Sequence, residues 1–376
     1  MTVKETLSEL VAINSVSALS NEPIIAYLEQ RVKTLGFITR RFSYVDEFGV
    51  EKINLVAISG TEFSESTEVE LALVGHTDTV PFDPNWNEAL ALTEREGKLF
   101  GRGACDTKAF IAAALTALHN IEIDRFQRPL ALVFTADEEI GLRGAKYLAD
   151  LKPLSPRYSV VGEPTSLQPI RAGKGYSLAE VIVRGREAHS AYPALGASAI
   201  VAAARLVSRM QDIADKLKSE QHEDFDPSYT TLNVGLIRGG TAKNIIAGEC
   251  RFTLEWRPVP NQTSSRVLDL VKAAIDDETN MNSETAAEVN LERMDSGFET
   301  ASESKIVSLM ESLTGKTAGT VAIGTEAAQM TLLGSEAVVL GPGNIREAHR
   351  TGEFVPISEL ERCTEILKAT VSELCL

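Results

Sequence analysis

The stretch Leu71-Ala72-Leu73-Val74-Gly75-His76-Thr77-Asp78 (LALVGHTD, 71–78) joins a short apolar run directly to a histidine and an aspartate. The run is long enough for one buried strand, and three similar runs follow, at 130–136, 159–162 and 337–340. Helical patterns lie between some of them, at 108–119 and 142–151. Buried strands that alternate with helices predict an α/β layer fold whose central sheet is mostly parallel.

The segment 173–291 has a different rhythm from the chain on either side of it. Its patterns predict strands at 176–183, 230–237, 251–257 and 287–293, and helices at 194–218 and 264–275. The order β-α-β-β-α-β is that of a split βαβ, ferredoxin-like α+β sandwich. We therefore expect a discontinuous first domain, 1–172 with 292–376, and an inserted second domain, 173–291.

The composition excludes several classes of partner. The 376 residues include 37 Lys+Arg and 53 Asp+Glu, so the net charge is −16. A chain this acidic is unsuited to nucleic acid or to an anionic membrane surface, because both attract basic faces. No apolar run reaches the ~18 residues of a membrane span, and the acidic start MTVKETLSEL is unlike a signal peptide. Four cysteines without a CxxC motif favour free thiols and a cytoplasmic location.

Acidic residues and histidines follow the apolar runs, at the sheet edge where ligands gather in open α/β folds. Singly, an aspartate after a strand is usually a turn former, adjacent glutamates are usually solvated, and a histidine is usually packed in a core. Together they would leave uncompensated charge at a buried edge unless a cation neutralised it. Imidazole and carboxylate are ligands typical of zinc, so the pattern predicts a metal site. The residues are His76, Asp78, Asp106, Asp137, Glu138, Glu139, Glu163 and His349.

The residue types also indicate how two metal ions could be shared. Asp106 ends a glycine-bearing turn, GRGACD (101–106), where it can approach closely enough to bridge two ions. Adjacent side chains point in different directions, so one of Glu138 and Glu139 can bind metal while the other acts as a base. Asp78 is placed two residues after His76, where a carboxylate can orient a metal-bound imidazole.

These motifs occur together in a known family. The chain resembles the co-catalytic zinc family of aminoacylases, carboxypeptidases and deacylases through GHTDTVP (75–81), GRGACDTK (101–108), TADEEIGLRGA (135–145), VVGEPT (160–165) and GPGNIREAHRTGEF (341–354). The inserted segment matches through RGREAHSAYPALGASAI (184–200) and IRGGTAKNIIAGEC (237–250). The resemblance implies a zinc-peptidase-like catalytic domain and an inserted domain that serves as a lid and as the dimer contact.

The resemblance implies a metal ligand set. His76 and Glu163 would bind one ion, Glu139 and His349 the other, and Asp106 would bridge them. Two zinc ions per chain are implied, and cobalt can substitute in such sites. Thr107 and Ala109 differ from the Met and Gly that usually follow the bridging aspartate, and the segment 350–354 also departs from the pattern. None of these departures touches a ligand, so they bear on the substrate rather than on the metals.

The resemblance also implies catalytic and substrate-binding residues. Glu138 would be the general base, and His189 would polarise the substrate carbonyl, from the partner subunit in dimeric members. We add Asp78 to the catalytic set for its position after His76, described above. The residues expected to hold a substrate carboxylate are Asn244, Arg257 and Thr325, and the acid beside them, Glu326, is our candidate for a substrate ammonium. Two alternatives stay open: Arg257 could form a structural ion pair, and His189 could be packed in a core.

The expected activity is removal of a small acyl group from an N-acylated amino acid by a homodimer. Desuccinylases, aminoacylases, dipeptidases and carboxypeptidases share the fold. A substrate with a distal carboxylate would require a further basic residue, for which Lys174 and Arg186 are candidates. A binding homologue without metal would be expected to lack a ligand, and none of the five is missing. The Ala-rich helix and strands of the inserted domain would bury their faces by pairing two copies edge to edge.

Overall fold

Residues 1–376 are described by a computed structural model, in which the chain forms two units. Unit 1 comprises Met1–Arg171, Glu299–Gly319 and Thr325–Leu376, and unit 2 comprises Ala172–Phe298 and Thr320–Gly324. The insertion thus extends beyond the sequence boundary at 291, because its last strand, β14 (Ala286–Asp295), continues past it. The return of 320–324 to unit 2 was not predicted.

The central sheet of unit 1 has the strand order β1-β2-β6-β3-β7-β17-β8-β15, and β16 pairs with β8. Its middle strands β6, β3, β7 and β17 are parallel to one another, whereas β1 pairs antiparallel with β2, β2 with β6, and β8 with β17. The expected mostly parallel centre is therefore confirmed. The sequence analysis did not predict the outer strands. The strands are β1 (Ile38–Val45), β2 (Glu51–Ile58), β3 (Thr67–His76), β6 (Leu130–Thr135), β7 (Leu154–Val161), β8 (Ile170–Gly173), β15 (Phe298–Glu299), β16 (Gly319–Val321) and β17 (Glu336–Val339).

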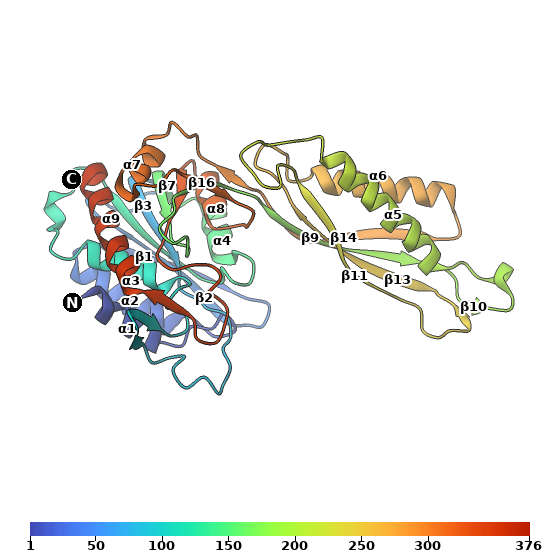
Figure 1. Ribbon diagram of the computed structural model, residues 1–376, viewed down its shortest axis with the longest axis horizontal. Coiled ribbons are helices and arrows are strands. Elements are labelled where there is room, and N and C mark those ends of the chain that lie inside the picture. Colours follow the sequence, from blue (N-terminus) through green and yellow to red (C-terminus); the bar gives the residue numbers. More distant parts are fainter. The chain divides into compact units, whose positions relative to one another are not determined.

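Helices cover both faces of this sheet (Figure 1). Alternate side chains of β3 explain the two layers: Leu71 and Leu73 join the core beneath α1, α2, α3 and α9, while the other face receives α4 and α8. A separate three-stranded sheet has the order β18-β5-β4. The remaining elements are α1 (Val3–Ala12), α2 (Glu22–Thr34), β4 (Thr93–Arg95), β5 (Lys98–Phe100), α3 (Lys108–Ala117), α4 (Arg143–Leu151), α7 (Lys305–Thr314), α8 (Ala327–Leu332), β18 (Phe354–Pro356) and α9 (Ile357–Cys375).

Unit 2 has the predicted β-α-β-β-α-β order. Its antiparallel sheet runs β11-β13-β9-β14, and α5 and α6 lie side by side on one face of it (Figure 1). Apolar side chains of the helices and strands form its own core, around Phe252, Leu206 and Val271. No helix of the chain is both long and apolar enough to cross a membrane. The elements are β9 (Tyr176–Arg184), β10 (Ala188–His189), α5 (Ala199–Leu217), β11 (Thr231–Gly239), β12 (Ile245–Ile246), β13 (Glu249–Arg257), α6 (Arg266–Met281) and β14.

Candidate metal centre

Five segments of unit 1 deliver the predicted metal ligands to the carboxyl edge of the parallel strands. His76 is the last residue of β3, Glu139 follows β6, and Glu163 follows β7. Asp106 lies in the turn before α3, and His349 lies in the loop between β17 and β18. Gly341 brings that loop close, because a Cβ there would lie 2.4 Å from the carbonyl oxygen of Glu163.

The five side chains form two groups that share one carboxylate. In the first group the ligand atoms of His76, Asp106 and Glu163 all lie within 4.8 Å of one another, and the same holds for Asp106, Glu139 and His349 in the second. The Nε2 atom of His76 lies 3.0 Å from Oδ1 of Asp106, and Nε2 of His349 lies 3.2 Å from Oδ2. The grouping expected from the sequence, including the shared position of Asp106, is thus present.

Burial makes this cluster electrostatically unfavourable without a cation. Burial and the neighbouring Asp106 raise the pKa of Glu163 well above its usual value. Burial also raises the pKa of Glu138, with a further contribution from Glu139. Hydrogen bonds with Asp106 and Glu139 raise the pKa of His349 to about 10, which favours the charged form of its imidazole. Carboxylates that crowd this closely, with imidazole nitrogens aimed at them, have the chemistry of a divalent cation site, so the residues fit two metal ions.

Asp78 has a role beyond the expected contact with His76. Its backbone carbonyl, not its carboxylate, makes the short contact to Nδ1 of His76, at 3.0 Å, while Oδ1 lies 3.6 Å away. An Nδ1 that donates to this carbonyl leaves Nε2 as the ligand atom. The carboxylate of Asp78 instead accepts the backbone N–H of Glu138 at 3.0 Å and that of Glu139 at 3.3 Å. Asp78 therefore holds the turn that carries the candidate base.

Glu353 supports the bridging ligand, and the sequence analysis did not identify it. Its Oε1 accepts the backbone N–H of Cys105 at 2.8 Å and that of Asp106 at 3.1 Å, while Arg102 forms a buried ion pair with its Oε2 at 2.5 Å. The side chain is 1% exposed. The only sequence signal was the position of Glu353 in the divergent segment 350–354, four residues after His349.

His189 and Asn244 lie next to each other in unit 2. His189, in β10, pairs with Ile245 of β12, and the N–H of Ser190 donates to the carbonyl of Asn244. Nδ1 of His189 accepts the N–H of Ala191 at 3.0 Å, so the ring proton resides on Nε2 and can be donated to another group. Both residues are exposed, which argues against a core role for His189.

Arg257 forms the ion pair that the sequence left as an alternative. Its Nε lies 2.6 Å from Glu255, and its guanidinium lies 4.0 Å from the ring centre of Tyr176. This pairing engages Nε, so the terminal nitrogens are still able to receive a carboxylate.

The two further basic residues of unit 2 are already engaged. The buried ammonium of Lys174 donates to the carbonyls of Pro227 and Tyr229, at 2.6 and 2.7 Å. Arg186 donates to the carbonyl of Leu195 and pairs with Glu284. Lys174 and Arg186 are therefore less available to bind a distal carboxylate of a substrate than the sequence suggests.

Thr325 and Glu326 lie at the start of α8 in unit 1. Oγ1 of Thr325 accepts the N–H of Ala327 at 3.2 Å, so its hydroxyl proton can be donated to another group. Glu326 is completely buried, and neither carboxylate oxygen makes a hydrogen bond of normal geometry. Burial raises the pKa of Glu326 to about 7. Its burial makes it less accessible to a substrate ammonium than the sequence suggests.

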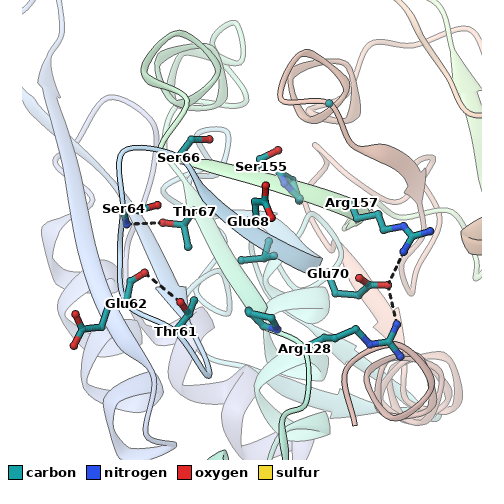
Figure 2. A pocket seen from close by; sticks show the side chains of 14 residues that line it. Thr61, Glu62, Ser64, Ser66, Thr67, Glu68, Glu70, Arg128, Ser155 and Arg157 are labelled. Atoms are coloured by element: carbon teal, nitrogen blue, oxygen red, sulfur yellow. Dashed lines mark hydrogen bonds and ion pairs between the residues drawn. The ribbon is translucent and has the colours of Figure 1, made fainter.

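A separate cavity of about 750 Å³ lies at the opposite edge of the sheet, where β3 and β7 begin (Figure 2). Its charged centre is Glu70, which pairs with Arg128 at 3.1 Å and with Arg157 at 3.6 Å. Hydroxyl groups of Ser64, Ser66 and Ser155, among others, complete the lining, and no histidine or cysteine takes part. The cavity thus contains none of the predicted ligands.

Comparisons with known proteins agree with this geometry. The model of peptidase family M20/M25/M40 matches residues 72–373. The chain belongs to this family. It is 48% identical over 374 residues to an acetylornithine deacetylase of Myxococcus xanthus, which covers 99% of this chain and 97% of the relative. The family expected from the motifs is therefore confirmed.

Solved structures have the same fold. A tripeptidase of Staphylococcus aureus superimposes with a TM-score of 0.76 at 26% identity, over 98% of this chain and 97% of that one. The YXEP protein of Bacillus subtilis, described as a dinuclear metal binding peptidase from the M20 family, has a TM-score of 0.68 at 13% identity, over 99% of this chain and 98% of that one. The second likeness bears on the fold alone.

Replacing Asp106 by alanine should weaken both metal sites together, because it removes the only carboxylate common to the two groups. Equilibrium dialysis against zinc, followed by elemental analysis, should show the apparent Kd of both ions raised by more than about 100-fold. Asp83→Ala, at an exposed position, is the control and should leave binding unchanged. Retention of one tightly bound ion by the Asp106 variant would contradict the shared role.

Proposed function

We propose that the protein is a dinuclear zinc amidohydrolase that converts N2-acetyl-L-ornithine and water to L-ornithine and acetate. The observation that carries the proposal is the pair of ligand groups sharing Asp106, with Glu138 beside them. The substrate is suggested by the name of the Myxococcus relative and by the motifs GRGACD, GEPTSLQP and GTEA, which resemble acetylornithine deacetylases. We further propose a cytoplasmic enzyme of arginine biosynthesis, in which cobalt can replace zinc.

The chemistry requires one proton acceptor at the reacting carbonyl. Two bound divalent ions would polarise the substrate carbonyl and lower the pKa of water. A carboxylate oxygen of Glu138 takes a proton from the attacking water, and it then passes this proton to the leaving amine nitrogen. Burial raises the pKa of Glu138, whereas two bound cations would favour its ionised form, which is the form that accepts the proton.

The residues proposed to hold the substrate are those expected from the sequence. Arg257, with Asn244 and the Thr325 hydroxyl, is proposed to receive the α-carboxylate, because a guanidinium matches a carboxylate in two-point geometry. Glu326 is our candidate for the ammonium of ornithine, which would require its carboxylate to become accessible and ionised. A preference for a succinylated substrate is less favoured, because Lys174 and Arg186 are engaged within unit 2.

We also propose a homodimer in which His189 acts on the partner's substrate. Unit 2 exposes apolar side chains on the edge strand β11 and at the start of α5, namely Leu236, Ile237, Ile200 and Val201. These two elements contact each other, and a second copy could cover exposed side chains along this edge of unit 2. The proton on Nε2 of His189 would then stabilise the carbonyl oxygen of the substrate as it gains charge.

Glu138→Gln should abolish most turnover without loss of metal. Glutamine has the shape of glutamate but cannot accept the proton, so kcat should fall by about 10²–10⁴-fold. Elemental analysis should still find two ions per chain. Loss of an ion from this variant would instead make Glu138 a ligand and exchange its role with that of Glu139.

Acetylornithine should be cleaved tens of times faster, in kcat/KM, than acetylnorvaline. Leaving an acidic partner unpaired costs roughly 1–3 kcal/mol, so Glu326→Gln should remove most of this difference. A panel of N-acetyl and N-succinyl amino acids, with added zinc or cobalt, provides the test. Equal rates on the two acetylated substrates, or faster cleavage of a succinylated one, would overturn the assigned substrate but not the metal site.

Mixed dimers should recover activity that neither parent has. His189→Ala and Glu138→Gln chains are each expected to be inactive, yet a hybrid contains one site with both residues intact if His189 acts on the partner. Assays of co-expressed, differently tagged chains should show a substantial fraction of the wild-type rate. Verified hybrids that stay inactive would place His189 in the site of its own chain, or outside catalysis.

A further inference from the structure

Lys52 is a fully buried lysine that belongs to none of the motifs described above. It lies in β2, and its side chain is 1% exposed. Its ammonium donates to the carbonyls of Ser17 and Leu19, the second at 2.8 Å. Its Nζ also lies 3.3 Å from Oδ1 of Asp137 and 3.7 Å from Asp46. A buried charge needs partners of this number and kind, and here one partner directly precedes the candidate base.

Asp137 has a backbone conformation that requires support. Its φ is +54°, in the left-handed region that a residue other than glycine rarely adopts. Such a conformation persists only where the surrounding contacts hold it. Two contacts do so here: the hydroxyl of Tyr44 donates to Oδ2 at 2.8 Å, and the Lys52 ammonium faces Oδ1. The path of the chain from β6 to Glu138 therefore depends on the side chain of Asp137, which contacts Tyr44 of β1 and Lys52 of β2.

Lys52 also reaches the same turn by a second route. The Ser17 residue whose carbonyl it binds donates its own hydroxyl to Oδ2 of Asp78, at 2.7 Å. Asp78 in turn accepts the backbone N–H groups of Glu138 and Glu139. The Lys52 ammonium thus contacts Asp137, which precedes Glu138. It also contacts Ser17, whose hydroxyl binds the carboxylate of Asp78.

We propose that Lys52 is a positioning residue for catalysis, which holds the Glu138–Glu139 turn through Asp137 and through Ser17. It does not touch the substrate or the reacting atoms. The inference rests on the role of Glu138 given under the proposed function. Because a misplacement of about 1 Å at the reacting groups costs about 10²-fold in rate, loss of this anchor should act on turnover before it acts on substrate binding.

The test compares Lys52→Met with Leu367→Ala, a buried truncation in α9 that lowers stability elsewhere in unit 1. For Lys52→Met, we expect kcat on N-acetylornithine to fall by about 10²-fold while KM changes less than about threefold, with two zinc ions retained. Hydrogen–deuterium exchange of the segment 136–142 should be faster than in the wild type. Leu367→Ala should lower Tm but leave kcat and the exchange of this segment unchanged.

A second pair of variants covers the case in which Lys52→Met does not fold. Tyr44→Phe removes only the hydroxyl that binds Asp137, and Lys52→Met with Asp137→Asn removes both buried charges together. Each should lower kcat and accelerate exchange of 136–142. Folded, zinc-loaded variants with wild-type kcat and exchange would overturn the proposal, as would an equal loss of kcat in Leu367→Ala.

The exchange and zinc measurements do not depend on the substrate. If wild-type protein fails to cleave N-acetylornithine but Lys52→Met still loosens the segment 136–142, the proposed substrate fails and the anchoring role stands. If the wild type is active and Lys52→Met changes neither kcat nor exchange, the anchoring role fails and the substrate assignment stands.

Discussion

The shared carboxylate of Asp106 is the constraint on which the arrangement of unit 1 depends. Its two oxygens lie 3.0 and 3.2 Å from imidazole nitrogens that come from opposite ends of the sequence. For these contacts to form, the ends of β3, β6 and β7 and the loop before β18 must meet in one place. Parallel strands supply that convergence, because their carboxyl ends share one edge of the sheet. This convergence buries several acidic groups together, and their burial raises the pKa values of Glu138 and Glu163.

Two further carboxylates hold the turns that carry the ligands, and they do so in the same way. Glu353 accepts the backbone N–H groups of Cys105 and Asp106, and Asp78 accepts those of Glu138 and Glu139. Each adds negative charge to an already acidic region. Buried cations offset it: Arg102 pairs with Glu353, and Lys52 faces Asp137. Lys108, whose pKa burial lowers to about 7, adds a third buried basic group beside the bridging turn. The polar network around the site is therefore as extensive as the ligand set itself.

The sequence predicts those parts of the fold and site that are encoded locally. The apolar runs before His76 and Glu163 identify central strands. The periodic spacing of apolar residues predicts the β-α-β-β-α-β order of unit 2. The supporting groups could not be predicted, since they act over long separations: Glu353 contacts Asp106 across 247 residues, and Tyr44 contacts Asp137 across 93. A lone Lys52 at the start of a strand is typical of a solvated surface. Nothing in its neighbours indicates that its ammonium is enclosed by carbonyls from a distant loop.

The five candidate ligands alone do not determine which amide bond is cleaved. An acetylornithine deacetylase at 48% identity and a tripeptidase at 26% identity share this fold over nearly the whole chain. Discrimination between substrates on this fold would then rest on groups outside the five candidate ligands, where a mismatched polar contact is costly. In this chain the groups open to such a role are few. Arg257 has terminal nitrogens beyond its pair with Glu255, His189 has a proton on Nε2, and Glu326 is buried with a pKa of about 7. A buried acid of this kind favours a cationic substrate only if binding exposes and ionises it. Selectivity for an ammonium group would then depend on the same local rearrangement that admits the substrate.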